Sequence, residues 1–426
     1  MLDLKYVREN LETVAASLNR RAPGTFDAAA FKVIDDARRA AITEAEKFKA
    51  AKNELSKQIG ALKQAKQNAD ELMAKSKGLT DELAAAEAKA TEADEKLYDI
   101  LKRTPNTPHE SVPNGASADD NVKAKSWGTV PTFSFTPKPH WELGESLGIL
   151  DWERAAKITG ARFTVYKGLG ARLERALIQF MLDTQTTKNG YTEMWTPLMV
   201  NAESLFATGQ LPKFEEDLFK LRGEKDYYLI PTAEVPITNY HRDETLEASA
   251  LPIKYAGYTP CFRSEAGAYG KDTRGMVRQH QFNKVELVKF TAPETSFDEH
   301  EKLTADAESI LEALELPYQR MLLCAGDMGF GATKCYDLEV YSAGQEKKWW
   351  ECSSCSNFGD FQARRANIKV KTADGKKVLA HTLNGSGLAT SRVMPAILEN
   401  NQQADGSVII PKVLRPYMGG LERITR

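Results

Sequence analysis

The chain has 426 residues, a length that allows two or three domains, and its 57 Lys and Arg residues nearly balance 59 Asp and Glu residues. The formal net charge of −2 provides no overall positive field, so a nucleic-acid partner would have to bind a local basic patch. The N-terminal MLDLKYVREN includes Asp3 and Glu9 without an apolar run, and no stretch approaches the roughly 18 apolar residues that cross a bilayer, so we expect a cytoplasmic protein with no membrane partner.

Residues 27–103 form the first distinct segment, which is rich in Ala, Lys, Glu and Leu and free of proline. Apolar residues recur at heptad spacing in two runs, a pattern that predicts a hydrophobic seam along each of two helices. This rhythm lapses between Gln64 and Asp70, where the chain can turn back. We therefore predict an antiparallel helical hairpin, each leg having about 35 residues and a length of about 50 Å.

The charge of the predicted hairpin is uneven, with lysines near its tip and acids toward the base of its second leg. One interpretation is a solvated coiled coil whose charges only keep it soluble. The other is a basic distal surface that contacts the phosphates of an RNA. The lysines that would form this surface are Lys47, Lys49, Lys52, Lys57, Lys63, Lys66, Lys75 and Lys77.

The chain after the hairpin begins with an irregular segment and continues as mixed helices and strands. Residues 104–136 contain clusters of Pro, Asn, Gly and Ser, which predict a linker. Apolar spacing predicts helices over 169–184 and 295–314, and YTEMWTPLMV reads as a strand interrupted by Pro197. Several later strands pair directly as hairpins, so we expect an α+β fold with an antiparallel β-sheet flanked by helices.

Two predicted strands within residues 258–290 carry more charge than a sheet needs, and they flank a glycine-rich loop. The residues expected to share a face are Arg263 and Glu265 on the first strand, and Arg278, Phe282 and Glu286 on the second, with Val285 and Leu287 opposite. A lattice of salt bridges would explain this pattern. The functional alternative is that the arginines neutralise phosphate oxygens while Phe282 stacks on a base. The sequence contains neither a Walker loop nor a dinucleotide-binding fingerprint.

The five cysteines are sparse and odd in number, which is typical of reduced thiols. The spacing Cys352-x-x-Cys355 raises the alternative of a zinc or redox site. A zinc site would need a second close pair, and Cys324 and Cys335 are too far apart in sequence to supply one. We expect buried thiols rather than structural zinc.

Several motifs resemble those of a known class of enzymes. The segments FRSEAG, DTRG and RQHQFNKVE resemble motif 2 of class II aminoacyl-tRNA synthetases, and GSGLATSR resembles motif 3. The helix and the strand around Pro197 resemble motif 1, which builds the dimer interface in that class. Within the class, PTAEVP, ECSSCSNFGDFQARR and HTLNGSGLA resemble the bacterial seryl-tRNA synthetase family, and the likeness covers almost the whole chain.

The resemblance implies the organisation of the chain and its reaction. Residues 1–110 would be a tRNA-binding domain with its arm at about 27–103, and residues 111–426 a catalytic domain with motifs at about 169–200, 258–290 and 381–402. The enzyme would be a homodimeric ligase that forms seryl-adenylate from L-serine and ATP. It would then transfer serine to the 3′ end of serine tRNA, with selenocysteine tRNA as a further substrate.

The resemblance also implies the ATP site. Arg263 would hold the α-phosphate and the serine carboxylate, and Arg278 the folded-back triphosphate. Phe282 would stack on adenine with Arg392 on its other side, and Glu265 would receive the adenine amino group. These three arginines would be the catalytic groups. The full implied ATP-binding set is Arg263, Ser264, Glu265, Arg278, Gln279, Phe282, Glu351, Cys352, Ser353, Ser354 and Arg392.

The implied metal and serine sites complete the active site. Glu351 and Ser354 would bind a Mg²⁺ ion that bridges the phosphates. Cys352 departs from the family pattern, in which this position is usually aliphatic, and on a strand its side chain should point away from Glu351. The implied serine-binding set is Thr232, Ala233, Glu234, Arg263, Glu286 and Ser386.

Most of these residues could instead have a purely structural role. Thr232 and Glu234 could form only a turn between prolines, Ser386 could cap a helix, and Glu351 and Ser354 could be a surface pair on a strand. For the whole chain, one alternative is a synthetase-like ligase that loads a carrier protein, although its relatives lack the long hairpin. A coiled-coil scaffold with a degenerate ATP fold would be expected to lack the three arginines.

Overall fold

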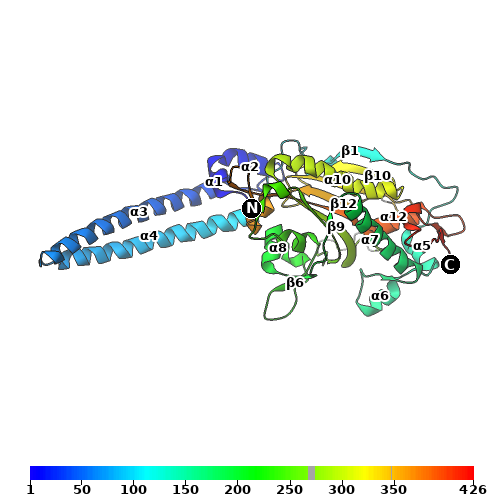
Figure 1. Ribbon diagram of the computed structural model, residues 1–426, viewed down its shortest axis with the longest axis horizontal. Helices are drawn as coiled ribbons and strands as arrows, with labels where there is room; N and C mark the ends of the chain where they lie inside the picture. Colours follow the sequence, from blue (N-terminus) through cyan, green and yellow to red (C-terminus); the bar gives the residue numbers. More distant parts are fainter. Residues whose placement is uncertain (267–273, 347) are drawn as a thin grey trace. The chain divides into compact units, whose positions relative to one another are not determined.

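The structure is a computed structural model that describes residues 1–266, 274–346 and 348–426 (Figure 1). The chain divides into two compact units, one formed by Leu2–Pro105 and the other by Asn106–Arg426 together with Met1. The glycine-rich segment 267–273 of the predicted motif 2 loop lies outside the described residues.

The N-terminal unit contains four helices within Leu2–Pro105, all of which the structure describes: α1 (Leu4–Glu9), α2 (Leu11–Asn19), α3 (Ala28–Gln64) and α4 (Asp70–Arg103). Asp27 caps α3 by accepting a hydrogen bond from the backbone N–H of Ala30 at 2.9 Å. Helices α3 and α4 lie side by side and antiparallel (Figure 1), which confirms the predicted hairpin. They turn between Gln64 and Asp70, the interval in which the apolar rhythm lapses.

The seam of the hairpin combines small and large side chains, with Leu55 and Leu97 among the buried residues. Ala41 of α3 and Ala86 and Ala93 of α4 are buried, and an ion pair between Arg38 and Asp94 crosses between the helices. Small residues at the contact bring the helix backbones close together. Most stability of such a long pair comes from this packed seam rather than from helix propensity.

The second unit is built on a large, mainly antiparallel sheet. Among the described residues it has eight strands in the order β1-β10-β11-β12-β15-β9-β8-β4, of which only the β4–β8 pair is parallel. Their bounds are β1 (Val122–Trp127), β10 (Tyr318–Leu322), β11 (Lys334–Tyr341), β12 (Trp349–Asn357), β15 (His381–Ala389), β9 (Gln281–Thr291), β8 (Ile253–Phe262) and β4 (Thr192–Glu193).

Three helices cover one face of this sheet (Figure 1): α7 (Leu169–Thr187), α10 (Ser296–Ala313) and α12 (Thr390–Asn400). Leu177 of α7, Leu303 of α10 and Val393 of α12 form one core with Val285 and Leu287 of β9. Because side chains alternate along a strand, the residues between Val285 and Leu287 point to the opposite face. This confirms the predicted α+β fold and leaves that opposite face of β9 open for a ligand.

Shorter elements complete the unit. They are α5 (His140–Ser146), β2 (Leu150–Asp151), α6 (Trp152–Ile158), β3 (Val165–Tyr166), β5 (Met199–Asn201), α8 (Ala202–Thr208), β6 (Tyr227–Leu229), α9 (Glu234–Asn239), β7 (Thr245–Glu247), α11 (Phe361–Ala366), β13 (Lys369–Lys371), β14 (Lys377–Leu379), β16 (Val408–Ile409) and β17 (Arg423–Ile424). No helix in the described parts of the chain has the length and apolar character needed to span a membrane.

Some local predictions differ from the structure. The predicted linker contains strand β1, which pairs with β10 at the edge of the sheet and remains largely exposed, so it lacks the apolar alternation of a buried strand. Arg263 and Arg278 lie just beyond the ends of β8 and β9 rather than within them. Ser386 lies inside β15 and does not cap α12, whose N-cap position is Ala389.

Candidate active site

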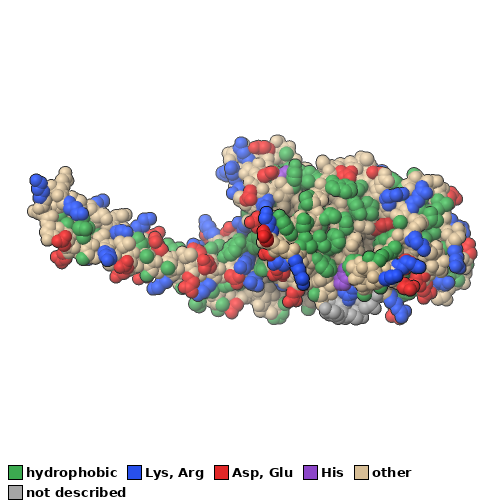
Figure 2. All heavy atoms as spheres, turned by 90° about the horizontal axis from the view of Figure 1, so that it is seen from below, with side chains coloured by type: hydrophobic (Ala, Val, Ile, Leu, Met, Phe, Trp, Pro, Cys, Tyr) green, Lys and Arg blue, Asp and Glu red, His purple; other side chains and the backbone are tan. Residues whose placement is uncertain are grey.

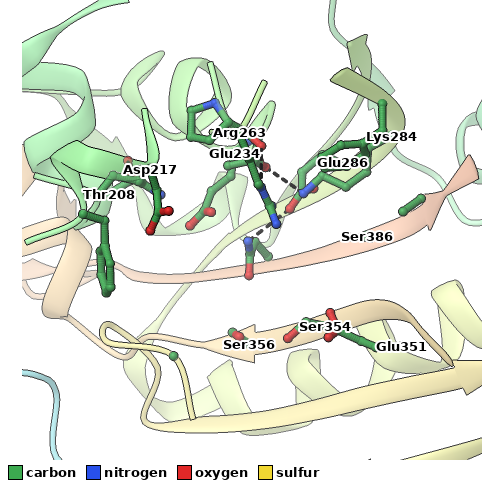
Figure 3. Close-up of a pocket in the computed structure, with 18 of the residues that line it drawn as sticks. Thr208, Asp217, Glu234, Arg263, Lys284, Glu286, Glu351, Ser354, Ser356 and Ser386 are labelled. Carbon is green, nitrogen blue, oxygen red and sulfur yellow. Dashed lines mark hydrogen bonds and ion pairs between the residues drawn. The ribbon is translucent and has the colours of Figure 1, made fainter. Parts of the chain in front are cut away.

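A cleft of about 470 Å³ lies on the face of the sheet that the three helices leave open (Figure 3). Its lining includes side chains from β9, β12, β15, the starts of α9 and α12 and the segment just after β8, which are far apart in sequence. The predicted residues that line it are Thr232, Glu234, Arg263, Glu265, Arg278, Gln279, Phe282, Glu286, Glu351, Cys352, Ser354, Ser386 and Arg392.

Three predicted residues are not among the described residues that line this cleft. Ala233 is fully buried in the core beneath α9. The Ser264 hydroxyl donates to the Glu216 carbonyl at 2.5 Å, and the Ser353 hydroxyl donates to the Ser386 carbonyl at 2.6 Å. Their side chains are therefore committed elsewhere, and a ligand would meet only their backbone.

Buried polar side chains form an acidic pocket around Glu286 within the cleft. Glu286 of β9 is 1% exposed and lies directly opposite Ser386 of β15 in the antiparallel ladder. Its carboxylate contacts the Lys284 ammonium at 2.6 Å and accepts a hydrogen bond from Asn384 at 3.0 Å. This network fixes the Glu286 carboxylate in one orientation, because a buried charge requires such partners.

A second buried carboxylate, that of Glu234, faces the same pocket (Figure 3). It accepts a hydrogen bond from Gln362 at 2.6 Å, and the neighbouring Thr232 hydroxyl accepts one from Lys284 at 2.9 Å. Burial and then the nearby charge of Glu286 raise the pKa of Glu234 to about 7. Within the described residues Glu234 has no ion-pair partner, so the pocket can accept one additional small cation.

The three arginines also line the cleft. The guanidinium of Arg263 lies 5.2 Å from the centre of the Phe282 ring, and its Nε donates to a backbone carbonyl. Arg278 pairs with Glu265 at 3.4 Å. Arg392 donates to the backbone carbonyls of Val277 and Glu351. The ion pair of Arg278 with Glu265 is of the kind that a lattice of salt bridges would contain, but it lies on the wall of an open cleft.

A β-bulge on β12 explains how Glu351 and Ser354 come to line the same cleft. Two residues three positions apart on a regular strand point to opposite faces. The pairing of β12 with β11 shifts register at Cys352, so the consecutive Cys352 and Ser353 are both buried while Glu351 and Ser354 face the cleft. The Cys352 thiol donates to the Leu338 carbonyl at 3.3 Å, within the core.

The donor chemistry of this pair fits a hard divalent cation. A carboxylate and a hydroxyl are oxygen ligands, which Mg²⁺ prefers, and Mg²⁺ normally completes its shell with water and substrate phosphates. No group of three or more His, Cys, Asp or Glu suited to a metal occurs among the described residues. Glu351 and Ser354 could therefore hold such an ion only together with oxygens from a ligand.

All five cysteines are buried and unbridged, as predicted. Burial raises the pKa of Cys355 to about 12 and also raises that of Cys352. Both thiols are consequently neutral at pH 7, whereas the thiolate is the form that reacts and binds metals.

The sequence prediction missed, among others, three residues that bond to the acidic pocket: Lys284, Asn384 and Gln362. Lys284 lies between Phe282 and Glu286 at the two-residue spacing of a strand, and Asn384 stands two residues before Ser386, so strict alternation would have identified both. Gln362 lies 128 residues from Glu234 in sequence, and no local pattern links them.

The antiparallel sheet and its arginine-rich cleft are those of a class II aminoacyl-tRNA synthetase: residues 216–401 match the family model described as the tRNA synthetase class II core domain for G, H, P, S and T. Residues 1–108 match the seryl-tRNA synthetase N-terminal domain. The chain is 56% identical to a serine–tRNA ligase of Geobacter sulfurreducens, with 100% of each chain covered. It is 57% identical to one of Acidobacterium capsulatum, with 98% of this chain and 97% of the relative covered. The chain belongs to the seryl-tRNA synthetase family.

Solved structures agree with this assignment. The seryl-tRNA synthetase from Pyrococcus horikoshii complexed with ATP has a TM-score of 0.94 and 37% identity, covering 100% of this chain and 99% of that one. The cytoplasmic serine–tRNA ligase from Naegleria fowleri in complex with AMP has a TM-score of 0.90 and 29% identity, with the same coverage. The likeness extends over both compact units.

Proposed function

We propose that this protein joins L-serine to serine tRNA in two steps, adenylate formation and transfer. The observation that carries this proposal is the juxtaposition in one cleft of a buried acidic pocket, formed by Glu234 and Glu286, with the guanidinium groups of three arginines. The acidic pocket suits an ammonium and a hydroxyl, and the arginines suit a triphosphate.

In the first step the serine carboxylate attacks the α-phosphorus of ATP, and pyrophosphate leaves. The carboxylate is already a nucleophile, so the protein need only position it and neutralise the charge that accumulates at phosphorus. Arg263 would contact the α-phosphate, Arg278 the terminal phosphates, and Phe282 the adenine ring. Rotation of Arg278 away from Glu265 would then be part of ATP binding.

Mg²⁺ would be held by Glu351 and Ser354, as their shared face and oxygen chemistry support. When bound, this ion would supply positive charge to the phosphate oxygens. In the second step a ribose hydroxyl at the 3′ end of tRNA takes the seryl group, and AMP leaves.

The replacement of Glu286 by Gln should weaken serine activation far more than ATP binding. The amide would place an NH₂ or a neutral oxygen against Lys284 and remove a charge that the pocket relies on, while the phosphate-binding arginines stay in place. We expect the KM for serine in pyrophosphate exchange to rise about 100-fold, and the KM for ATP about threefold or less. Equal losses in both constants would refute this assignment of the pocket.

Serine binding should also depend on pH through Glu234. Its pKa of about 7 means that the neutral acid predominates at lower pH, and the neutral acid cannot pair with the serine ammonium. The apparent KM for serine should therefore rise about tenfold from pH 8 to pH 6, in proportion to the lost carboxylate fraction. The matched control is Glu234→Gln, which should bind serine weakly at every pH. A wild-type KM that does not change over this range would contradict the assignment.

We assign tRNA binding to residues 1–110 and catalysis to residues 111–426. Seven of the eight lysines predicted near the tip of the hairpin are exposed and Lys52 is half-buried, and none of them forms an ion pair among the described residues. Figure 2 shows Lys and Arg side chains at the tip and along the arm, with Asp and Glu side chains more frequent toward its base. Unpaired lysines can neutralise RNA phosphates without breaking an existing bond.

We also propose that the protein is a cytoplasmic homodimer. Trp195 is 84% exposed, and Leu198 and Met199 beside it are 38% and 47% exposed, so the segment after α7 presents apolar side chains of the kind that oligomer interfaces bury. This is the predicted motif 1 region. Sedimentation should show a dimer for the parent protein and a monomer for Trp195→Glu; a parent protein that sediments as a monomer at micromolar concentration would overturn it.

The direct test is acylation of purified tRNA with radiolabelled serine in the presence of ATP and Mg²⁺. Serine tRNA should become labelled, and selenocysteine tRNA is the further substrate to include. An enzyme that makes seryl-adenylate but labels a carrier protein and no tRNA would instead support the carrier-protein alternative.

A further inference from the structure

The ATP site is supported from behind by a fully buried pair, His140 of α5 and Glu399 of α12, which lie on adjacent helices (Figure 1). The imidazole Nδ1 contacts the Glu399 carboxylate at 2.7 Å, and the His140 backbone N–H donates to the same oxygen at 2.9 Å. The other ring nitrogen, Nε2, accepts a hydrogen bond from the backbone N–H of Met276 at 2.9 Å. This pattern defines a neutral imidazole with its proton on Nδ1.

The Glu399 carboxylate accepts five hydrogen bonds, which fix its position. Besides the two bonds from His140, its carboxylate accepts from the Ser342 hydroxyl at 2.6 Å, the Gly344 N–H at 2.8 Å and the Gln345 amide at 3.1 Å. Burial raises the pKa of the Glu399 carboxyl, and the hydrogen bonds that it accepts from His140 and Ser342 lower it. The carboxylate is thus ionised, and it fixes the orientation of the imidazole.

The segment that His140 holds carries the groups proposed to bind ATP. Arg278 and Gln279 stand two and three residues after Met276. The Gln279 amide donates back to the Met276 carbonyl at 2.9 Å. Arg392 Nε donates to the carbonyl of Val277 at 2.8 Å. Residues 275–277 are therefore a shared support for three side chains of the cleft.

We propose that His140 and Glu399 are positioning residues for ATP: they fix residues 275–277 and thereby the placement of Arg278, Gln279 and Arg392. This inference rests on the proposed ATP-binding roles of those three residues. Neither His140 nor Glu399 lines the cleft in the described structure, so they act through the backbone and do not touch the nucleotide.

Gly275 provides a test with a matched control. Its φ is +74°, and a Cβ there would lie 2.0 Å from His140 Nε2, so alanine must displace either the imidazole or the segment. Gly375 has a similar φ of +82° with nothing within 4 Å of the corresponding Cβ, so Gly375→Ala measures the backbone strain alone. In serine-dependent pyrophosphate exchange, we expect Gly275→Ala to raise the KM for ATP about tenfold or more and Gly375→Ala to leave it within about twofold. The KM for serine should change little in both.

A second pair of variants separates hydrogen bonding from packing. In His140→Gln the side chain still carries an acceptor for the Met276 N–H, whereas in His140→Leu a side chain of similar size carries none. If the hydrogen bond to the Met276 N–H positions residues 275–277, the KM for ATP of His140→Gln should be several-fold closer to wild type than that of His140→Leu. This difference should hold whatever the shift in melting temperature.

The outcomes are distinct from those that test the proposed function. A parent protein without serine-dependent exchange would contradict the proposed function itself. If the parent protein exchanges normally, two results would overturn the positioning role. One is an equal KM for ATP in Gly275→Ala and Gly375→Ala. The other is an equal rise of the KM values for ATP and serine in Gly275→Ala. Equal KM values for ATP in the Gln and Leu variants would overturn it as well.

Discussion

Replacing Arg263 with lysine should lower the maximal rate of serine-dependent pyrophosphate exchange by about 100- to 1,000-fold. Lysine keeps the positive charge but loses the planar fork that can contact a phosphate and a carboxylate together. It also loses the guanidinium face that lies 5.2 Å from the centre of the Phe282 ring. The measurement is exchange at saturating ATP and serine, so that a loss of rate is separated from a loss of binding.

The control for this substitution is Arg154→Lys. Arg154 pairs with Asp151 on the surface, and its side chain is 72% exposed, so its replacement should leave the exchange rate unchanged. A lysine variant at position 263 with the wild-type rate would contradict the proposed contact with the reacting phosphate.

Removing the distal arm should abolish tRNA acylation while pyrophosphate exchange persists. Replacing residues 39–93 by a short glycine-rich turn keeps the Arg38–Asp94 pair and the bidentate contact of Arg8 with Asp35, so the base of the hairpin stays closed. We expect a fall in acylation of about 1,000-fold, because the lysines near the tip lose their phosphate contacts, and a change in exchange of about threefold or less.

Charge reversals identify which part of the arm matters. Lys63→Glu with Lys66→Glu at the tip should weaken acylation and reduce its dependence on salt, whereas reversal of the exposed Lys89 with Lys96 nearer the base should have little effect. Loss of exchange together with acylation in the truncated protein would mean that the arm supports the catalytic unit rather than the tRNA.

The hairpin was predictable because its determinants are local. A heptad pattern specifies a helix, and its lapse between Gln64 and Asp70 coincides with the end of α3 and the start of α4. The open and covered faces of β9 were equally predictable, since alternation along one strand places Phe282 and Glu286 opposite Val285 and Leu287.

The remainder of the site depends on contacts between distant segments. Gln362 of α11 reaches Glu234 at the start of α9 because both helices pack against α8, and no heptad or strand pattern in the sequence predicts that contact. The shared face of Glu351 and Ser354 depends on a bulge at Cys352, which is set by the pairing with β11. These two residues were predicted from the resemblance to the family, because strand alternation alone would have placed them on opposite faces of the sheet.

The most direct test of serine activation is the amino-acid selectivity of adenylate formation. Purified protein with ATP and Mg²⁺ is given each of the standard amino acids in turn, and the return of labelled pyrophosphate into ATP is measured. Serine should support exchange, and alanine should do so with an efficiency at least about 10,000-fold lower, because a pocket built around buried polar groups is left unpaired by a substrate without the hydroxyl. Exchange with another amino acid and not with serine, or with alanine as readily as with serine, would show that the acidic pocket does not select serine.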